Sequence, residues 1–147
     1  MTDIALPPFS AAAANYLPWR RSGNLVYIAG QIARDAAGNV APFLGRLGAE
    51  FDTAQGSAAA RACGLHVLSA LANALDGDLG RVVACVRVGG FVAATPEFTD
   101  HSQVINGVSD LLVETLGQRG AHARAAVGVA SLPRGVCVEV EAIFEVH

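Results

Sequence analysis

Two charged side chains near the C-terminal end of the chain have the chemistry to bind and process a small acid. Residues 123–146 alternate between apolar and polar in two runs, with a turn signal at residues 132–135 between them, which predicts two strands joined by a turn. A symmetric turn places Gly128 opposite Glu139 and so puts Glu139 on the same sheet face as Arg124. The two backbones would then lie roughly 13 Å apart at ~3.3 Å per residue, a span that suits a small anion.

The predicted face suits carboxylate recognition beside a hydrolytic step. The guanidinium of Arg124 stays charged at physiological pH and can hold a carboxylate with two hydrogen bonds, while Glu139 could position and activate a water molecule. The small residues Ala126 and Gly128 lie between the two charges on that face. A strand pair that merely exposes one face to solvent would show a similar alternation, although with larger polar residues, so both interpretations stay open.

Other catalytic patterns are missing from the sequence. It contains no helical HExxH, Gx4GK[ST], GxGxxG or GxSxG, so the metalloprotease, P-loop, dinucleotide-binding and α/β-hydrolase classes have no support. Four histidines show no metal-ligand spacing, and we expect neither a metal nor a cofactor; they are His66, His101, His122 and His147. Cys137 shares the predicted face of Glu139 but has no neighbouring base, which favours a buried thiol.

The composition predicts one domain, residues 1–147, with much apolar area to cover. The 147 residues are 52% hydrophobic and only 16% charged, and the mean hydropathy is positive. A partner subunit is the simplest cover for that area. A net charge of -3 and a pI near 5.7 disfavour binding to nucleic acid backbones.

Cysteine usage and the N-terminal segment predict a cytoplasmic protein. The three cysteines form no CxxC pattern, and an odd number suits reduced thiols. The N-terminal segment has an early Asp3 and two prolines, where a secretory signal would have basic residues followed by an apolar run. No uninterrupted apolar run reaches the ~18 residues that a membrane helix needs, so no membrane partner is expected.

The N-terminal third predicts an irregular start followed by a hairpin. Residues 1–14 show no periodic pattern, whereas residues 16–21 and 24–32 read as strands on either side of a Ser-Gly-Asn turn. Gly30 near the end of the second strand indicates either a bulge or a place where a ligand approaches the backbone. Residues 40–47 predict a short irregular strand.

A helix should follow, capped by Asp52 or Thr53 and ending near residues 76–78. Apolar residues recur within it at spacings of three and four, which is typical of a helix packed on a sheet. The residues expected on the inner face are Ala58, Ala62, Leu65, Leu68, Ala72 and Leu75.

The second half predicts a strand, a helix and the two C-terminal strands. Residues 81–94 alternate and are rich in valine, with Gly89 and Gly90 as a kink. Thr95-Pro96 supplies a cap for a helix over residues 96–116. Its expected inner residues are Val104, Val108, Leu111, Leu112 and Thr115. These elements predict an α+β two-layer domain, a mixed sheet with both helices on one face and the other face free for a partner.

The C-terminal run ARAAVGVASLPRGVCVEVEAI resembles the closing signature of the RidA/YjgF reactive intermediate deaminases, also catalogued as L-PSP endoribonucleases. The likeness extends upstream, since residues 15–31 resemble the first hairpin of that family and residues 78–92 its middle strand. The segment Arg46-Leu47-Gly48 resembles an insertion of a divergent branch.

The resemblance implies a chorismate-mutase-like fold and a homotrimer with three pockets between subunits. The implied activity is hydrolysis of 2-imino and 2-enamino acids, such as 2-aminoacrylate, to 2-keto acids and ammonia without a cofactor. Arg124 matches the arginine that binds the substrate carboxylate, and Glu139 the glutamate that positions the attacking water. Tyr16 and Gly30 match pocket residues, and Asn106 matches a pocket asparagine across a one-residue insertion.

Two positions depart from the family pattern. Ala126 stands where the family has a cysteine and Ala29 where it has a serine, which makes the expected pocket less polar and affects which substrate it prefers. The alternatives to imine hydrolysis are an endoribonuclease, as the older family name suggests, and a non-catalytic trimer that binds small carboxylic acids.

Overall fold

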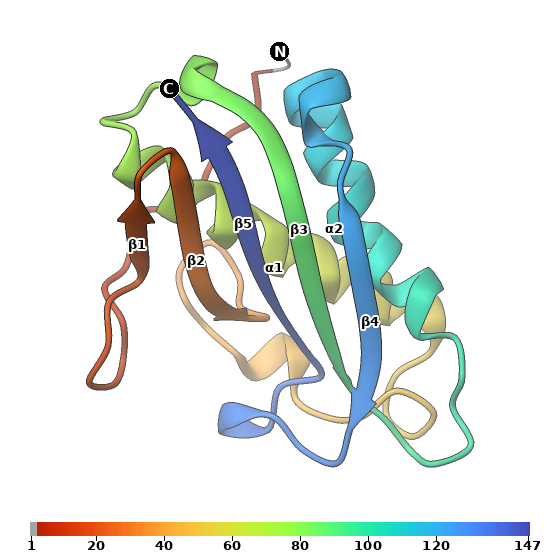
Figure 1. Cartoon of the computed structure of the whole chain (residues 1–147). Coiled ribbons are helices and arrows are strands. Elements are labelled where there is room, and N and C mark those ends of the chain that lie inside the picture. Colours follow the sequence, from red (N-terminus) through yellow and green to blue (C-terminus); the bar gives the residue numbers. More distant parts are fainter. Residues whose placement is uncertain (1–2) are drawn as a thin grey trace.

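A computed structural model describes residues 3–147, in which a five-stranded mixed sheet is covered on one face by two helices (Figure 1). The strands are β1 (Trp19–Ser22), β2 (Leu25–Ile32), β3 (Val82–Ala93), β4 (Ala123–Val129) and β5 (Val138–Val146), and the helices are α1 (Thr53–Ala74) and α2 (His101–Leu116). The sheet order is β1-β2-β5-β3-β4, with only β3 and β4 parallel. The predicted α+β class is confirmed. Residues 1 and 2 of the predicted irregular start lie outside the described residues.

Helix α1 begins where the sequence predicts, because Asp52 forms a capping box. Its carboxylate accepts a hydrogen bond from the Gln55 amide at 2.8 Å, and the Gln55 side chain accepts one from the Asp52 amide at 2.9 Å. The predicted inner stripe is only partly right. Leu68 and Leu75 are buried, but Ala58 is exposed and Ala62, Leu65 and Ala72 are half-buried. The reason is that α1 packs against the sheet and against α2, so its buried surface is rotated and wider than one stripe.

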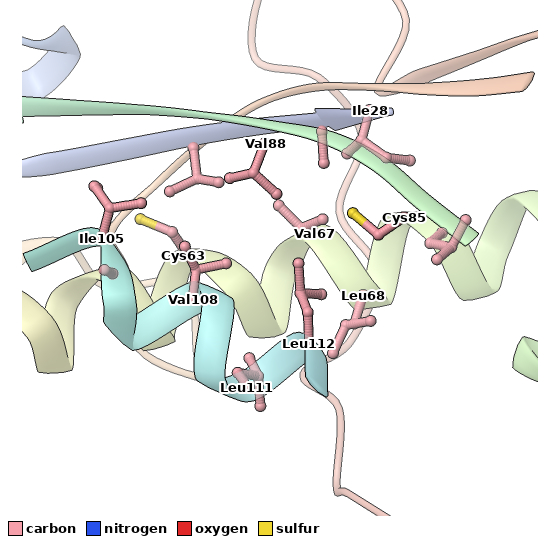
Figure 2. Packing of buried hydrophobic residues seen from close by; sticks show 14 of the residues in the cluster. Ile28, Cys63, Val67, Leu68, Cys85, Val88, Ile105, Val108, Leu111 and Leu112 are labelled. Atoms are coloured by element: carbon pink, nitrogen blue, oxygen red, sulfur yellow. The ribbon is translucent and has the colours of Figure 1, made fainter. Parts of the chain in front are cut away.

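Glycines allow the two helices to approach closely. A Cβ on Gly64 would lie 2.8 Å from Leu111 and from Val108, and a Cβ on Gly107 would overlap the Ser57 carbonyl oxygen. Figure 2 shows Val108, Leu111 and Leu112 of α2 packed against α1 beneath the sheet. All five inner residues predicted for α2 are buried, so that face is confirmed.

Three local predictions are wrong at their boundaries. α2 begins at His101, not at the Thr95-Pro96 cap, because the Thr95 amide donates to the Leu47 carbonyl at 3.0 Å and keeps the chain extended there. β1 begins at Trp19 instead of residue 16. The segment 40–47 contains a short 3-10 helix, Ala41–Phe43, where Pro42 takes a helical position, and pairs only through isolated bridges at Leu44 and Leu47.

The predicted kink at Gly89 and Gly90 is also wrong, since the register of β3 shifts nearer its start, between Val82 and Ala84 and between Cys85 and Arg87. Gly90 has another role. A Cβ there would lie 2.5 Å from Ile105, so the missing side chain makes room for α2 on the sheet.

The predicted C-terminal hairpin is wrong, because β3 lies between β4 and β5. β4 pairs in parallel with β3, and β5 pairs antiparallel with β3 and β2. The unit β3-α2-β4 explains this: a helix crossover returns the chain beside the strand it left and parallel to it. The connection over residues 130–137 then passes the end of β3, as Figure 1 shows.

Candidate functional site

Glu139 projects into a cavity of about 320 Å³ on the uncovered side of the sheet. The cavity is bounded by the N-terminal segment, the end of β2 and the short 3-10 turn η4 (Pro133–Gly135). Its lining includes Ser10, Tyr16, Gly30, Gln31, Arg34, Arg134 and Glu139. Three of the predicted site residues, Tyr16, Gly30 and Glu139, are therefore brought together, and Tyr16 is 54% exposed at the cavity.

Gly30 sits at a bulge, as one of the two sequence interpretations predicted. The pairing of β2 with β5 shifts register between Ile28 and Gln31, on either side of the glycine. A Cβ at Gly30 would overlap the Oε2 atom of Glu139. The bulge and the missing side chain together let the carboxylate lie directly against the backbone of β2.

We expect Gly30→Ala to displace the Glu139 carboxylate and to lower any activity that depends on its position. The added methyl group must push Glu139 aside, and an error of ~1 Å in the position of a catalytic group can reduce the rate about 100-fold. Steady-state kinetics on a 2-imino acid, the substrate class that the family resemblance implies, would measure this, with Gly23→Ala as the control. Gly23 has a φ of +58° but nothing within 4 Å of the added Cβ, so it affects stability alone. Equal kinetics for Gly30→Ala and the wild type would contradict this role for Gly30.

The Glu139 carboxylate is half-buried and has neither a hydrogen bond nor an ion pair with residues 3–147. Burial raises the pKa of the Glu139 carboxyl, and the negative charge of Glu141 raises it further. A carboxyl group with a raised pKa can accept and release a proton closer to neutral pH, which suits a general acid and base.

The raised pKa predicts a stability effect with a defined sign. The Glu139 carboxyl has a higher pKa in the folded chain than in the unfolded chain, so folding favours its protonated form. The fold therefore loses stability as the pH rises through the folded pKa and regains it as the pH falls. We expect Glu139→Gln to raise the thermal midpoint by roughly 1–3 °C at about pH 7.5 and to leave it unchanged at about pH 4. Thermal melts at both pH values would test this, and an equal difference at both would contradict it.

Arg124 lies on the other face of the sheet, where α2 holds it. Its Nη1 donates to the Asn106 side-chain oxygen at 2.8 Å and to the Ser109 hydroxyl at 3.0 Å, and its Nη2 donates to the Ser102 carbonyl at 3.2 Å. The predicted neighbours Asn106 and Arg124 are therefore brought together. All these acceptors are uncharged, so the positive charge of the guanidinium is not neutralised by them.

A second hydrogen-bond layer orients Ser109. His122 Nδ1 lies 2.6 Å from the Gly120 carbonyl oxygen, so in the neutral ring Nδ1 carries the proton and Nε2 accepts from the Ser109 hydroxyl at 2.8 Å. The lone pairs of that hydroxyl then face Arg124. This layer was not predicted, because the contacts join α2 to the start of β4.

The prediction that Arg124 and Glu139 share a sheet face is wrong within one chain. Val88 of β3 pairs with Arg124 on one side, whereas Phe91 pairs with Glu139 on the other. Paired residues share a face and successive residues alternate, so positions 88 and 91 point in opposite directions. The strands that carry the two charges are also two spacings apart, about 10 Å.

The small residues beside Arg124 make room for α2 and the segment before it, and Gly128 also lines a separate cavity of about 410 Å³ with Thr95 and His101. A Cβ on Gly128 would lie 2.6 Å from Nε2 of His101, and Ala126 packs partly buried against the core. Ala29 lies outside the Glu139 cavity and lines a more open hollow with Tyr27 and Glu141. Neither Ala29 nor Ala126 lines the cavity that contains Glu139.

Two arginines of the cavity were missed by the sequence reasoning. Arg34 follows β2 by two residues and Arg134 lies in the η4 turn. Arg34 is half-buried, and its buried Nε–H has no acceptor within residues 3–147, which typically costs about 1–3 kcal/mol. Burial lowers the pKa of Arg34, and the nearby positive charge of Arg134 lowers it further.

The cysteines do not contribute nucleophiles. Cys63, Cys85 and Cys137 are free and buried, which confirms the prediction of a buried thiol for Cys137. Burial raises the pKa of Cys137 to about 11, far above the range in which a thiol ionises readily. Residues 3–147 contain no cluster of His, Cys, Asp and Glu that could hold a metal ion, and none of their helices is long and apolar enough to span a membrane.

Comparison with known proteins places this chain and its fold in a family. The sequence family described as "YjgF/chorismate mutase-like, putative endoribonuclease" matches residues 1–144. Protein TCP17 of Trypanosoma cruzi is 44% identical over 145 residues, which cover 98% of this chain and 89% of that protein. The chain belongs to the YjgF/chorismate mutase-like family.

Solved structures agree with this assignment. The crystal structure of the protein Atu1372 from Agrobacterium tumefaciens is 43% identical with a TM-score of 0.88, and the match covers 95% of this chain and 87% of that one. A structure from Shewanella oneidensis, described as a "putative endoribonuclease", is 29% identical with a TM-score of 0.92, covering 97% and 93% of the two chains.

Proposed function

We propose that the protein hydrolyses 2-imino and 2-enamino acids to 2-keto acids and ammonia, as a homotrimer with sites shared between subunits. The main observation behind this proposal is the position of the Glu139 carboxylate. It is half-buried, has no hydrogen-bond or ion-pair partner within residues 3–147, and lies above Gly30 in a cavity of small-molecule size. A group with a raised pKa in such a place is suited to handle the protons of one water molecule.

Sharing between subunits follows from the separation of the two charges. Arg124 lies on the edge strand β4, half-buried and turned toward α2, while the Glu139 cavity opens on the uncovered face. Since one chain cannot bring them together, a complete site needs Arg124 of one subunit and Glu139 of the next. A cyclic trimer repeats this head-to-tail contact three times and closes.

The uncovered sheet face has the apolar surface that such an interface needs. Tyr27 is 43% exposed and Val127 is 46% exposed, and the pairing registers place Phe91 and Ile143 on the same face. Exposed apolar area of this extent is typical of a subunit contact. Light scattering on the purified protein would measure the proposed trimer mass.

In the proposed reaction Arg124 binds the substrate carboxylate, and Glu139 takes a proton from water as the water oxygen attacks the imine carbon. The C=N bond gives its π electron pair to nitrogen, to which Glu139 returns the proton, and a carbinolamine results. The hydroxyl proton then passes to the amine, again through Glu139, and the C–N bond breaks as the C=O bond forms, which releases ammonia. Holding both reactants in place supplies most of the acceleration, because an imine carbon is already electrophilic. No cofactor enters this scheme.

A coupled assay tests the proposal. A flavin-dependent amino-acid oxidase generates 2-iminopropanoate from alanine, and the remaining imine is trapped and quantified with semicarbazide. We expect the protein to lower the trapped imine and to speed the release of ammonia. Trapping that is the same with and without the protein would overturn the assignment.

Two other functions are separated by simple measurements. The family description favours an endoribonuclease; cleavage of RNA that disappears in Arg124→Ala would support it. Binding of 2-keto acids without turnover of any imine would instead indicate a non-catalytic carboxylate-binding trimer.

The three free buried thiols suit a reducing compartment, and we propose that the reaction takes place in the cytoplasm.

A further inference from the structure

The Glu139 cavity contains two guanidinium groups for which the proposed reaction has no use. Arg34 and Arg134 line it together with Glu139. The single ion pair found within residues 3–147 joins Arg61 to Glu114 on the helices, so neither cavity arginine has a carboxylate partner there. The cavity of one subunit therefore has an excess of positive charge, although the chain as a whole carries a net charge of -3.

Arg34 is oriented by uncharged acceptors. Its Nη1 donates to the Ser10 hydroxyl at 2.8 Å and its Nη2 donates to the Gln31 side-chain oxygen at 2.9 Å. Gln31 is itself fixed, because its amide nitrogen donates to the Ala29 carbonyl at 3.1 Å. These contacts set the direction of the guanidinium and leave its charge, and one further N–H on each of Nη1 and Nη2, for a ligand.

Arg134 stands at the rim of the same cavity in an unusual backbone conformation. Its φ of 59° and ψ of 12° lie in the left-handed region, which residues other than glycine and asparagine seldom adopt. Such strain is found mostly at functional positions. Two cationic side chains that line one cavity with a single carboxylate, and form no ion pair within residues 3–147, are a typical composition of an anion-binding site.

The part of the site that one subunit forms is also larger than a three-carbon substrate needs. Its volume of about 320 Å³ corresponds to roughly ten water molecules at ~30 Å³ each, and thus to a molecule of about ten non-hydrogen atoms. A four- or five-carbon imino acid with a second carboxylate has about that size. In the shared site Arg124 is already assigned to the carboxylate next to the imine, so the two cavity arginines are free for a second acidic group.

We propose that the preferred substrates are 2-imino acids with a second, distal carboxylate, which Arg34 and Arg134 bind. This inference rests on the proposed function and names its substrate class. The chemical step is unchanged: water adds to the imine carbon, ammonia leaves, and the product is a 2-keto dicarboxylic acid.

The test compares imines that differ in the distal group. Flavin-dependent oxidases generate the imines of aspartate, glutamate and alanine, and semicarbazide trapping gives kcat/KM for each. We expect the wild type to prefer the two dicarboxylic imines by at least about tenfold. Arg34→Gln and Arg134→Gln should each lower kcat/KM for these imines by roughly 10- to 100-fold, the usual effect of losing a hydrogen bond to a charged group. The loss for the alanine imine should be at least about fivefold smaller, so that the preference for dicarboxylic imines falls in both variants.

Arg46→Gln is the matched control, since Arg46 is exposed and lies outside the cavity lining. Arg134 is exposed on a turn, so Arg134→Gln keeps the test valid if Arg34→Gln fails to fold. Rapid turnover of the alanine imine without preference for the dicarboxylic ones would overturn this inference and leave the proposed function intact.

Calorimetry with the product acids separates the remaining outcomes. Tighter binding of 2-oxoglutarate than of pyruvate in the wild type, with the difference lost in Arg134→Gln, would support the distal-carboxylate site. If the same protein hydrolysed no imine, the proposed reaction would be wrong but the binding site would stand. Equal binding of the two acids, or binding unaffected by either arginine variant, would overturn the inference.

Discussion

Glu139→Gln is expected to lower kcat/KM for a 2-imino acid by about 1,000-fold while the fold stays intact. Glutamine keeps the size of the side chain but can neither accept the proton of the attacking water nor return one to nitrogen, and general acid–base groups typically contribute factors of ~100 to ~10,000. The semicarbazide assay measures the change. Because the cavity carboxylate has no partner within residues 3–147, its replacement breaks no contact there, and the circular dichroism spectrum should match the wild type.

Glu141→Gln is the control for this prediction. Glu141 is the next outward-facing glutamate on β5, exposed and outside the Glu139 cavity, so we expect its replacement to change kcat/KM by less than about threefold. If Glu141→Gln lowered the activity as much as Glu139→Gln, the loss would reflect the charge of the sheet face and not a catalytic carboxylate.

Arg124→Ala is expected to lower kcat/KM by a similar factor, about 1,000-fold, since loss of one partner of a charged hydrogen-bonded pair typically costs about 2–5 kcal/mol. The fold should tolerate the change. Arg124 contacts only surface groups of α2, and water can replace the guanidinium at Asn106, Ser109 and the Ser102 carbonyl. Kinetics and thermal melting of the same preparation would measure both effects.

Two further variants show whether the charge of Arg124 is what matters. Arg124→Lys restores the charge without the two-pronged geometry and should recover only part of the activity. Arg61→Ala removes a half-buried arginine that is paired with Glu114 on the helices, away from either half of the site, and should leave the activity unchanged. Wild-type kinetics in Arg124→Ala would show that the substrate carboxylate is bound elsewhere.

Local patterns of the sequence were sufficient to predict most of the elements. Asp52 with Gln55 three residues later is a capping box, and it places the start of α1 correctly. The apolar positions of α2 repeat at three and four, and all of the predicted ones are buried. Gly30 could be interpreted as a bulge because a glycine near a strand end has few other roles.

The position of Glu139 relative to Arg124 could not be predicted from local patterns. The alternation of β4 and β5 is the same whether the strands pair with each other or lie on either side of β3. The deciding contact is non-local, since the α2 crossover places β4 parallel to β3, and β3 occupies the position beside β5 that a hairpin would give to β4. The face of each side chain then depends on its register with Val88 or Phe91, which the sequence does not reveal.

The cavity arginines were missed for a related reason. Arg34 and Arg134 are separated by a hundred residues and meet only where the N-terminal segment, the end of β2 and the η4 turn surround Glu139. Arg124, by contrast, lies in a regular alternating pattern beside small residues, which makes it recognisable from the sequence as a candidate carboxylate-binding group. Each cavity arginine stands alone in a loop, and a single charged residue in a loop is usually solvent-exposed.

The most direct test of the shared site is to combine two inactive chains in one oligomer. Arg124→Ala and Glu139→Gln chains with different affinity tags are co-expressed, and mixed oligomers are isolated by purification on both tags in turn. If each site takes Arg124 from one subunit and Glu139 from the next, every mixed trimer contains one intact site, and we expect about one third of the wild-type activity. Mixed trimers no more active than either single variant would contradict the shared site.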